Sequence, residues 1–289
     1  MKFESMSSYS GQIGGVPTGK AHKYLGAKLF LTFLSLLVIC PLGYLIVISF
    51  QNTEEYFKML WPRALRFDNY LNIIADPFFW RWTLNSGVIT LMVVVLVLVV
   101  GAMAGYVVAK FSSRLVRLFA LVILGALMVP IHMVLMPVFV LSRQLGLLNS
   151  PWSVIGPSVA FGIPLAMYIF RGFFVNVPNS LSEAARIDGA SELLVFVQVM
   201  LPMTKPAIAT VGVFTFLGSW NGFLFPLILL QNTENYTLPV GLATIGTQYF
   251  TNYPVQAAAM LMVSMPLILL YVKFNKQVIQ GMLEGAVKG

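Results

Sequence analysis

The sequence is poor in charged residues and in residues that bind metals or act as nucleophiles. Of its 289 residues, 10% are charged, whereas a soluble domain carries about 25%. One cysteine, Cys40, excludes a disulfide framework and a thiolate metal site. The two histidines, His22 and His132, form no H-E-x-x-H motif, and no G-x-S-x-G motif is present. We therefore expect no enzyme activity, metal or cofactor in this chain.

Apolar residues dominate instead. They make up 58% of the chain, and the mean hydropathy is +0.84. This composition predicts an all-α membrane protein, in which each span needs about 20 apolar residues. The six runs of sufficient length are residues 27–50, 84–109, 118–141, 152–174, 207–230 and 256–274. We expect one transmembrane domain over residues 27–276, with a flexible tail at 1–26 and a short tail at 277–289.

Positive charge predicts the orientation of these spans. If both termini and the loops at 110–117 and 171–206 share one side, that side holds 13 of the 18 Lys and Arg residues. Cytoplasmic loops are enriched in Lys and Arg, so this side is predicted to be cytoplasmic. The net charge of +8 is spread over these loops and forms no basic stripe. We therefore expect no nucleic-acid partner.

The N-terminal tail contains a pattern that imitates a phosphate-binding loop, Gly14-x4-Gly19-Lys20. The imitation is poor, because Ala21 stands where such a loop has a Ser or Thr and no strand precedes it. The first apolar run also begins late and is long, which argues against a cleaved signal peptide.

A polar stretch at residues 180–192 interrupts the apolar sequence. It holds three of the ten acids, and the chain has no other acid between Asp76 and Glu234. Ser180 and Glu183 have the spacing of a capping box, and Gly189 is a natural helix end, so we expect a short helix here. From composition alone, this helix is either a solvated connector or a docking element for a partner.

The same stretch resembles a known family. The pattern Glu183-Ala184-Ala185-x3-Gly189-x9-Val199-x-Leu201-Pro202 is similar to the EAA loop of ABC-importer permeases, E-A-A-x3-G-x9-I-x-L-P, with Val in place of Ile. The resemblance implies that the coupling loop, residues 178–206, carries a helix that docks on a separate ATPase. The implied contact residues are Glu183, Ala184, Ala185, Asp188, Gly189, Ala190 and Ser191.

Further stretches resemble the maltose-type branch of these permeases, which imports carbohydrates. They are residues 67–70, 85–86, 216–221, 237–242 and 284–289. The resemblance implies the type I importer fold, with six transmembrane helices and a cytoplasmic coupling helix, in the lipid of a bacterial inner membrane. It also implies three partner subunits and a delivery protein: a homologous second permease, two copies of an ATPase that carries the ATP and Mg, and an extracytoplasmic solute-binding protein. No residue selects a sugar over a polyol.

The middle of the fifth span is the candidate solute pathway. The proposed pathway residues are Gly218, Ser219, Trp220, Asn221 and Phe223. The Asn221 amide would lack partners in lipid, so we expect it to face the bundle interior, and Trp220 could stack on a sugar ring. Alternatively, Gly218 and Gly222 form a small-xxx-small helix contact, and Asn221 makes a structural hydrogen bond.

An ion-coupled secondary carrier is the alternative function. Such a carrier needs acids within its spans, and none is present here. His132 could relay protons, but no acid in the spans pairs with it. Prolines near the middles of spans, Pro130, Pro164 and Pro266, predict helix breaks that free carbonyl groups toward protein or a water-filled path.

Overall fold

The computed structural model describes residues 25–248 and 252–286, which contain helices and no strand. The helices of the first half are α2 (Leu25–Ser49), α3 (Thr53–Phe57), α4 (Asp68–Ala75), α5 (Pro77–Lys110), α6 (Arg114–Gly125), η1 (Ala126–Met128), α7 (Ile131–Gln144) and α8 (Pro151–Asn176). Those of the second half are α9 (Asn179–Ile187), α10 (Glu192–Leu194), η2 (Val195–Met200), α11 (Leu201–Met203), α12 (Lys205–Trp220), α13 (Leu224–Leu229), η3 (Thr233–Asn235), α14 (Leu238–Gln248) and α15 (Tyr253–Ala286). The predicted all-α class is confirmed.

The predicted N-terminal tail lies almost wholly outside the described residues, and the predicted C-terminal tail is mostly helical. Residues 1–24 of the N-terminal tail are outside the described part, and Leu25 already begins α2. At the other end, α15 continues to Ala286, so most of the segment expected as a tail after residue 276 is helical.

Four of the described helices are long and apolar enough to cross a membrane: α2, α5, α8 and α15. Two further spans arise if each bent pair of helices is one crossing, which gives up to six. The first pair, α6–η1 with α7, bends by 103°, and the second, α10–α11 with α12, bends by 80°. The predicted span at 118–141 is therefore not a continuous helix, and the predicted span at 207–230 is interrupted between the end of α12 at Trp220 and the start of α13 at Leu224.

Pro130 explains the bend between η1 and α7, but Pro164 and Pro266 do not break their helices. Pro130 lies directly before α7, where its extended ψ of 132° separates α7 from the preceding turn. A proline restricts the residue before it and removes an N–H donor, so the chain turns there. Pro164 and Pro266, by contrast, lie inside the continuous helices α8 and α15, and the breaks predicted at these positions are wrong.

The core of the molecule is the contact between α5 and α8. Gly101 and Gly105 of α5 face Ala166 and Phe170 of α8 so closely that an added Cβ would stand 2.6 Å from the Cβ of its neighbour in both cases. Small residues four apart let two helix backbones approach in this way. Phe170 is completely buried as a result.

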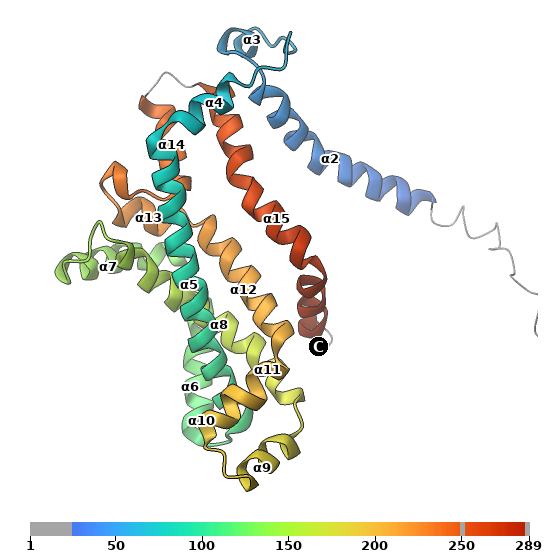
Figure 1. Cartoon of the computed structure of the whole chain (residues 1–289), viewed down its shortest axis with the longest axis vertical. Helices are drawn as coiled ribbons and strands as arrows, with labels where there is room; N and C mark the ends of the chain where they lie inside the picture. Colours follow the sequence, from blue (N-terminus) through green and yellow to red (C-terminus); the bar gives the residue numbers. More distant parts are fainter. Residues whose placement is uncertain (1–24, 249–251, 287–289) are drawn as a thin grey trace, which may run out of the picture.

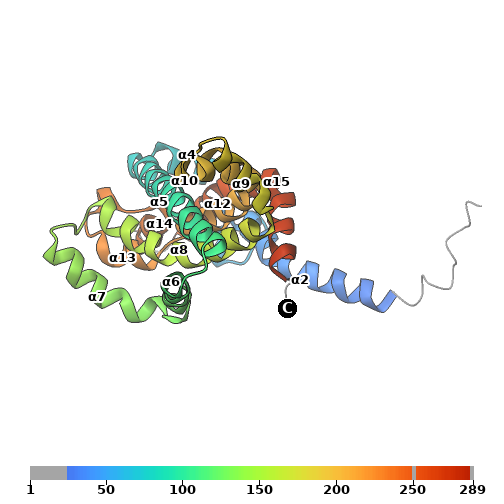
Figure 2. The same ribbon diagram turned by 90° about the horizontal axis from the view of Figure 1, so that it is seen from below.

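The long helix α5 connects the two ends of the molecule (Figure 1). Helices α3 and α4 lie at its N-terminal end, and α9 and α10 lie at its C-terminal end. Seen from below, α2 and α7 extend from opposite sides of the bundle (Figure 2). Most side chains of α2 are exposed, apolar and suited to lipid or to another membrane subunit.

Candidate functional site

The predicted docking helix exists as α9, but it begins differently from the expectation. Its N-cap position is Pro178, and no side chain caps the helix. Ser180 therefore lies inside the first turn, and the capping box predicted from Ser180 and Glu183 is wrong. With its extended ψ of 135°, Pro178 is the N-cap, so the helix starts two residues earlier than a cap at Ser180 predicts. Within the turn, the Ser182 hydroxyl donates to the Asn179 carbonyl oxygen at 2.9 Å.

The end of α9 is the one predicted. Gly189 has a φ of +87°, a conformation that L-residues with a Cβ avoid. Its N–H donates to the Arg186 carbonyl at 3.0 Å, and the Ala190 N–H donates to the Ala185 carbonyl at 2.9 Å. These two bonds form a Schellman motif, which stops the helix sharply. The prediction of a helix end at Gly189 is confirmed.

The outward face of α9 carries most of the predicted docking residues. Glu183, Ala184 and Asp188 are exposed, as is Gly189. One apolar side chain lies among them: Ile187 is 86% exposed, which is unusual on a polar segment. Ile187 was not among the predicted docking residues, and it adds apolar surface to this otherwise polar face between Arg186 and Asp188.

The remaining predicted docking residues serve the fold. Ala185 and Ala190 are partly buried and pack against the hydrophobic core. Ser191 is exposed, and its hydroxyl accepts the Leu194 N–H at 3.4 Å, which makes it the N-cap of α10. Ala184 thus lies on the outer surface, whereas the adjacent Ala185 packs against the core.

An ion pair closes the turn between α9 and α10. Arg186 donates from Nε and from its terminal nitrogen to the two carboxylate oxygens of Glu192, both at 3.1 Å. This hydrogen-bonded carboxylate raises the pKa of the Arg186 guanidinium above its ordinary value. A bidentate pair fixes geometry as well as charge, so α9 and α10 are held in one arrangement.

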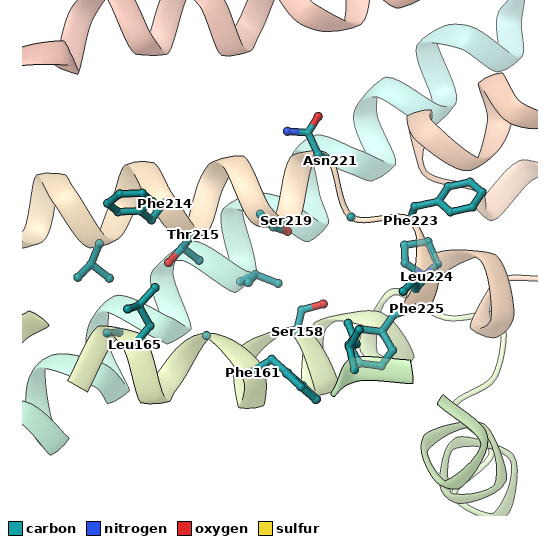
Figure 3. Close-up of a pocket in the computed structure, with 18 of the residues that line it drawn as sticks. Ser158, Phe161, Leu165, Phe214, Thr215, Ser219, Asn221, Phe223, Leu224 and Phe225 are labelled. Carbon is teal, nitrogen blue, oxygen red and sulfur yellow. The ribbon is translucent and has the colours of Figure 1, made fainter. Parts of the chain in front are cut away.

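The candidate pathway contains a cavity of about 530 Å³ between α8 and α12. In Figure 3, Thr215 and Ser219 of α12 lie across the cavity from Ser158 and Leu165 of α8. Four of the five predicted pathway residues line it, namely Gly218, Ser219, Asn221 and Phe223. The lining contains hydroxyl and amide groups but no Lys, Arg, Asp, Glu or His.

The break after α12 shapes one end of this cavity. The Asn221 side chain donates to the Leu217 carbonyl at 3.0 Å, so it makes the structural hydrogen bond that was the alternative interpretation, and it also lines the cavity. The small-xxx-small helix contact that was the other part of this alternative, at Gly218 and Gly222, finds no support among the described residues. A Cβ added at Gly218 would meet no atom within 4 Å, which leaves room there rather than a close helix contact.

Trp220 does not line the cavity. It is 5% exposed and packs with Phe79 and Trp82 in a separate hydrophobic cluster. Its ring stacks on Phe216 with centroids 5.7 Å apart, and its indole N–H donates to the Val263 carbonyl at 3.3 Å. The expectation that Trp220 is available to stack on a sugar is therefore corrected: its ring is buried and stacked on Phe216, and its indole N–H already has an acceptor in this conformation.

His132 lies in the first turn of α7, just after the bend, and is exposed. In residues 25–248 and 252–286, no group of three or more His, Cys, Asp or Glu side chains is placed to hold a metal ion.

Comparison with known proteins identifies the family. The family model described as "Binding-protein-dependent transport system inner membrane component" matches residues 98–283. The arabinooligosaccharides transport system permease protein of Halalkalibacterium halodurans is 35% identical over 89% of this chain and 94% of that protein. The diacetylchitobiose uptake system permease protein of Streptomyces coelicolor is 34% identical over 88% of this chain and 85% of that protein.

A solved structure shows the same architecture. A chain from a bacterial ABC transporter involved in the import of the acidic polysaccharide alginate superimposes with a TM-score of 0.77 and 25% identity, over 90% of this chain and 98% of that chain. The coupling-loop pattern, the helical fold and the family match thus agree. This chain belongs to the family of inner membrane components of binding-protein-dependent transport systems, and it has the fold of an ABC-importer permease subunit.

Proposed function

We propose that this chain is one of two permease subunits of an ATP-driven importer of oligosaccharides or related polyols. It pairs with a homologous permease to form the pathway, and two copies of an ATPase bind from the cytoplasm. A solute-binding protein delivers the sugar from the other side. Both termini and α9 lie in the cytoplasm, as the excess of Lys and Arg on that side favours.

One observation carries this proposal. The residues of the E-A-A-x3-G pattern form a discrete helix, α9, which lies at the far end of α5 from α3 and α4 (Figure 1). Its outer face combines charged residues with the exposed Ile187. An isolated helix with this surface is suited to insertion into a cleft of another protein.

The chemistry of the cavity supports a neutral, hydroxyl-rich solute. Ser158, Thr215, Ser219 and Asn221 offer hydrogen-bond donors and acceptors without a formal charge. Phe161, Phe214 and Phe223 offer aromatic surface, which packs against the C–H faces of sugar rings. The relatives described above are transport proteins for arabinooligosaccharides and diacetylchitobiose, which are carbohydrates of this kind.

The mechanism follows from the position of α9. Closure of the two ATPase subunits displaces α9, and the transmembrane helices attached to it rock as rigid bodies. The cavity then changes the side of the membrane to which it opens. Such coupling requires contacts that differ between the two states, and the exposed face of α9 supplies them.

Reconstitution tests this function. The complete complex, with its partner permease, ATPase and binding protein, is placed in liposomes with ATP on the ATPase side. Uptake of labelled arabinooligosaccharides, diacetylchitobiose, galactooligosaccharides and maltodextrins is then measured. We expect uptake of at least one sugar that requires ATP hydrolysis and the binding protein, and that persists when ionophores abolish ion gradients. Uptake that follows an ion gradient and ignores ATP would show a secondary carrier instead.

A further inference from the structure

Both ends of α9 are attached to the same transmembrane helix, α5. At the N-terminal end, the ammonium group of Lys110 donates to the Val177 carbonyl and to the Asn179 side-chain oxygen, both at 2.8 Å. Asn179 is the first residue of α9. The last residue of α5 therefore holds the first residue of α9.

The C-terminal end of α9 is attached through an acid. Glu192 holds Arg186 of α9 by the bidentate ion pair, and the same carboxylate accepts a hydrogen bond from the Tyr106 hydroxyl of α5. Tyr106 and Lys110 are four residues apart on α5, so they lie on one face of that helix. Together they form a two-point attachment, one point for each end of α9.

The attachment point at Tyr106 is rigid. Tyr106 is 4% exposed, and its ring packs edge-on against Phe174 at 5.6 Å and at a tilt against Phe196 at 5.1 Å between centroids. Burial of this kind leaves the hydroxyl a single position, pointing at Glu192. Its hydrogen bond to a charged acceptor is of the strong class.

The route from α9 to α12 has a different character. It passes through the π-helical turn η2 and then the 80° bend that precedes Lys205. Turns of π-helix occur frequently at functional sites, and sharp helix bends occur at prolines and π-turns, as here at Pro202 and Pro206. Side-chain hydrogen bonds thus join α9 directly to α5, whereas the chain reaches α12 from α9 through an irregular turn and a sharp bend.

We infer that Tyr106 and Lys110 are positioning residues that make α9 and α5 move as one body when the ATPase displaces α9. The inference rests on the proposed function and specifies where the force enters the membrane domain. Helix α8 follows α5, because the close contacts at Gly101 and Gly105 leave no room to slide. Helix α12 then changes its angle to this unit, and the cavity between α8 and α12 opens or closes.

Tyr106→Phe tests this inference cleanly. It removes one oxygen atom, keeps the buried ring and leaves the exposed face of α9 unchanged. Tyr70→Phe is the matched control, since it also deletes a hydroxyl that makes an internal hydrogen bond, to Ser49 Oγ at 2.7 Å, at the opposite end of the molecule. The readout is the number of ATP molecules hydrolysed per sugar imported in liposomes, with arabinotriose and diacetylchitobiose as probes.

Loss of a hydrogen bond to a charged group shifts an equilibrium by about tenfold, so we expect Tyr106→Phe to raise the ATP-to-sugar ratio by about tenfold. Tyr70→Phe should leave the ratio at the wild-type value. A merely structural role for Tyr106 would lower the amount of complex without changing this ratio. An unchanged ratio in Tyr106→Phe overturns the inference.

Lys110→Met provides the second measurement. It removes the attachment at the N-terminal end of α9, and we expect the same rise in the ratio, with a larger rise when it is combined with Tyr106→Phe. Wild-type values of both Lys110→Met and the double variant overturn the inference. The wild-type complex separates the two proposals: if it imports no sugar with ATP, the proposed function fails, and if it does so but the variants match it, the attachment to α5 alone fails.

Discussion

Gly105 of α5 and Phe170 of α8 are in such close contact that a Cβ at Gly105 would stand 2.6 Å from the Phe170 Cβ and 3.0 Å from the Arg171 backbone nitrogen. Neither neighbour is the end of a flexible side chain, so neither can move aside without shifting the backbone of α8. This contact therefore sets the distance between the two helices that form the core of the molecule.

Gly105→Ala should destabilise the permease for this reason. Overpacking of a filled core costs about 1–3 kcal/mol, and we expect a lower thermal midpoint of the purified complex. Gly87→Ala, on the same helix, is the control, because a Cβ there meets nothing within 4 Å. A Gly-to-Ala change in an open helix position is neutral or stabilises by up to about 1 kcal/mol. Equal midpoints for the two variants would contradict the tight α5–α8 contact.

Glu183→Lys and Gly189→Asp should each uncouple transport while the protein still inserts into the membrane. Glu183→Lys reverses a charge on the exposed face of α9. Gly189→Asp places a side chain at a φ of +87°, which costs about 1–2 kcal/mol and loosens the end of the helix. We expect sugar uptake to fall by about tenfold, which corresponds to about 1.4 kcal/mol, with normal amounts of permease in membranes.

Glu54→Lys is the matched charge reversal at the opposite end of the molecule. Glu54 is exposed and pairs with Lys58, a surface contact of the kind that contributes little. Uptake should remain normal in this variant. Normal uptake in both α9 variants would remove α9 from the mechanism.

Gly218→Leu should block the pathway without disturbing assembly. Gly218 lines the cavity, and a Cβ there meets no atom within 4 Å, so the leucine side chain extends into open space. We expect uptake to be lost while the complex still forms and hydrolyses ATP. Ser264→Leu, at a partly exposed position of α15 where the serine hydroxyl donates to the Met260 carbonyl of its own helix, is the control. Full uptake by Gly218→Leu would show that sugar does not pass through this cavity.

Trp220 should matter for stability rather than for sugar affinity. Truncation of a buried aromatic residue typically costs about 3–5 kcal/mol, and Trp220 is buried in one hydrophobic cluster with Phe79 and Trp82 and stacks on Phe216. Trp220→Phe keeps most of this packing, so we expect a lower thermal midpoint with an unchanged sugar concentration for half-maximal uptake. A higher sugar concentration for half-maximal uptake, with an unchanged thermal midpoint, would instead indicate that Trp220 stacks on the sugar.

The sequence was informative where local chemistry determines the outcome. Long apolar runs predicted the membrane class, and Gly189 predicted a helix end because few other residues accept its backbone conformation. The pattern around Glu183 predicted a separate helix, and four of five pathway candidates line the cavity. In each case, residues within one short segment determine the local structure.

Tertiary contacts explain what was missed. Tyr106 and Glu192, which are hydrogen-bonded to each other, lie 86 residues apart in sequence, so no local pattern links them. The G-x-x-x-G spacing of Gly101 and Gly105 was a readable signal for a helix contact, but it does not name α8 as the partner. Trp220 was assigned to the pathway by its neighbours in sequence, although one residue of helix rotation turns its side chain by about 100° toward another cluster.

The most direct test of the account asks which protein touches α9. Ile187→Cys, in a background where the only native cysteine is replaced by Cys40→Ala, places a thiol at an 86% exposed position on α9. A short thiol-reactive crosslinker is added to the assembled complex in membranes, and the crosslinked product is identified by mass spectrometry. The account predicts a crosslink to the ATPase and labelling by an impermeant maleimide only from the cytoplasmic side. Labelling from the extracytoplasmic side, or a crosslink to the solute-binding protein, would contradict it.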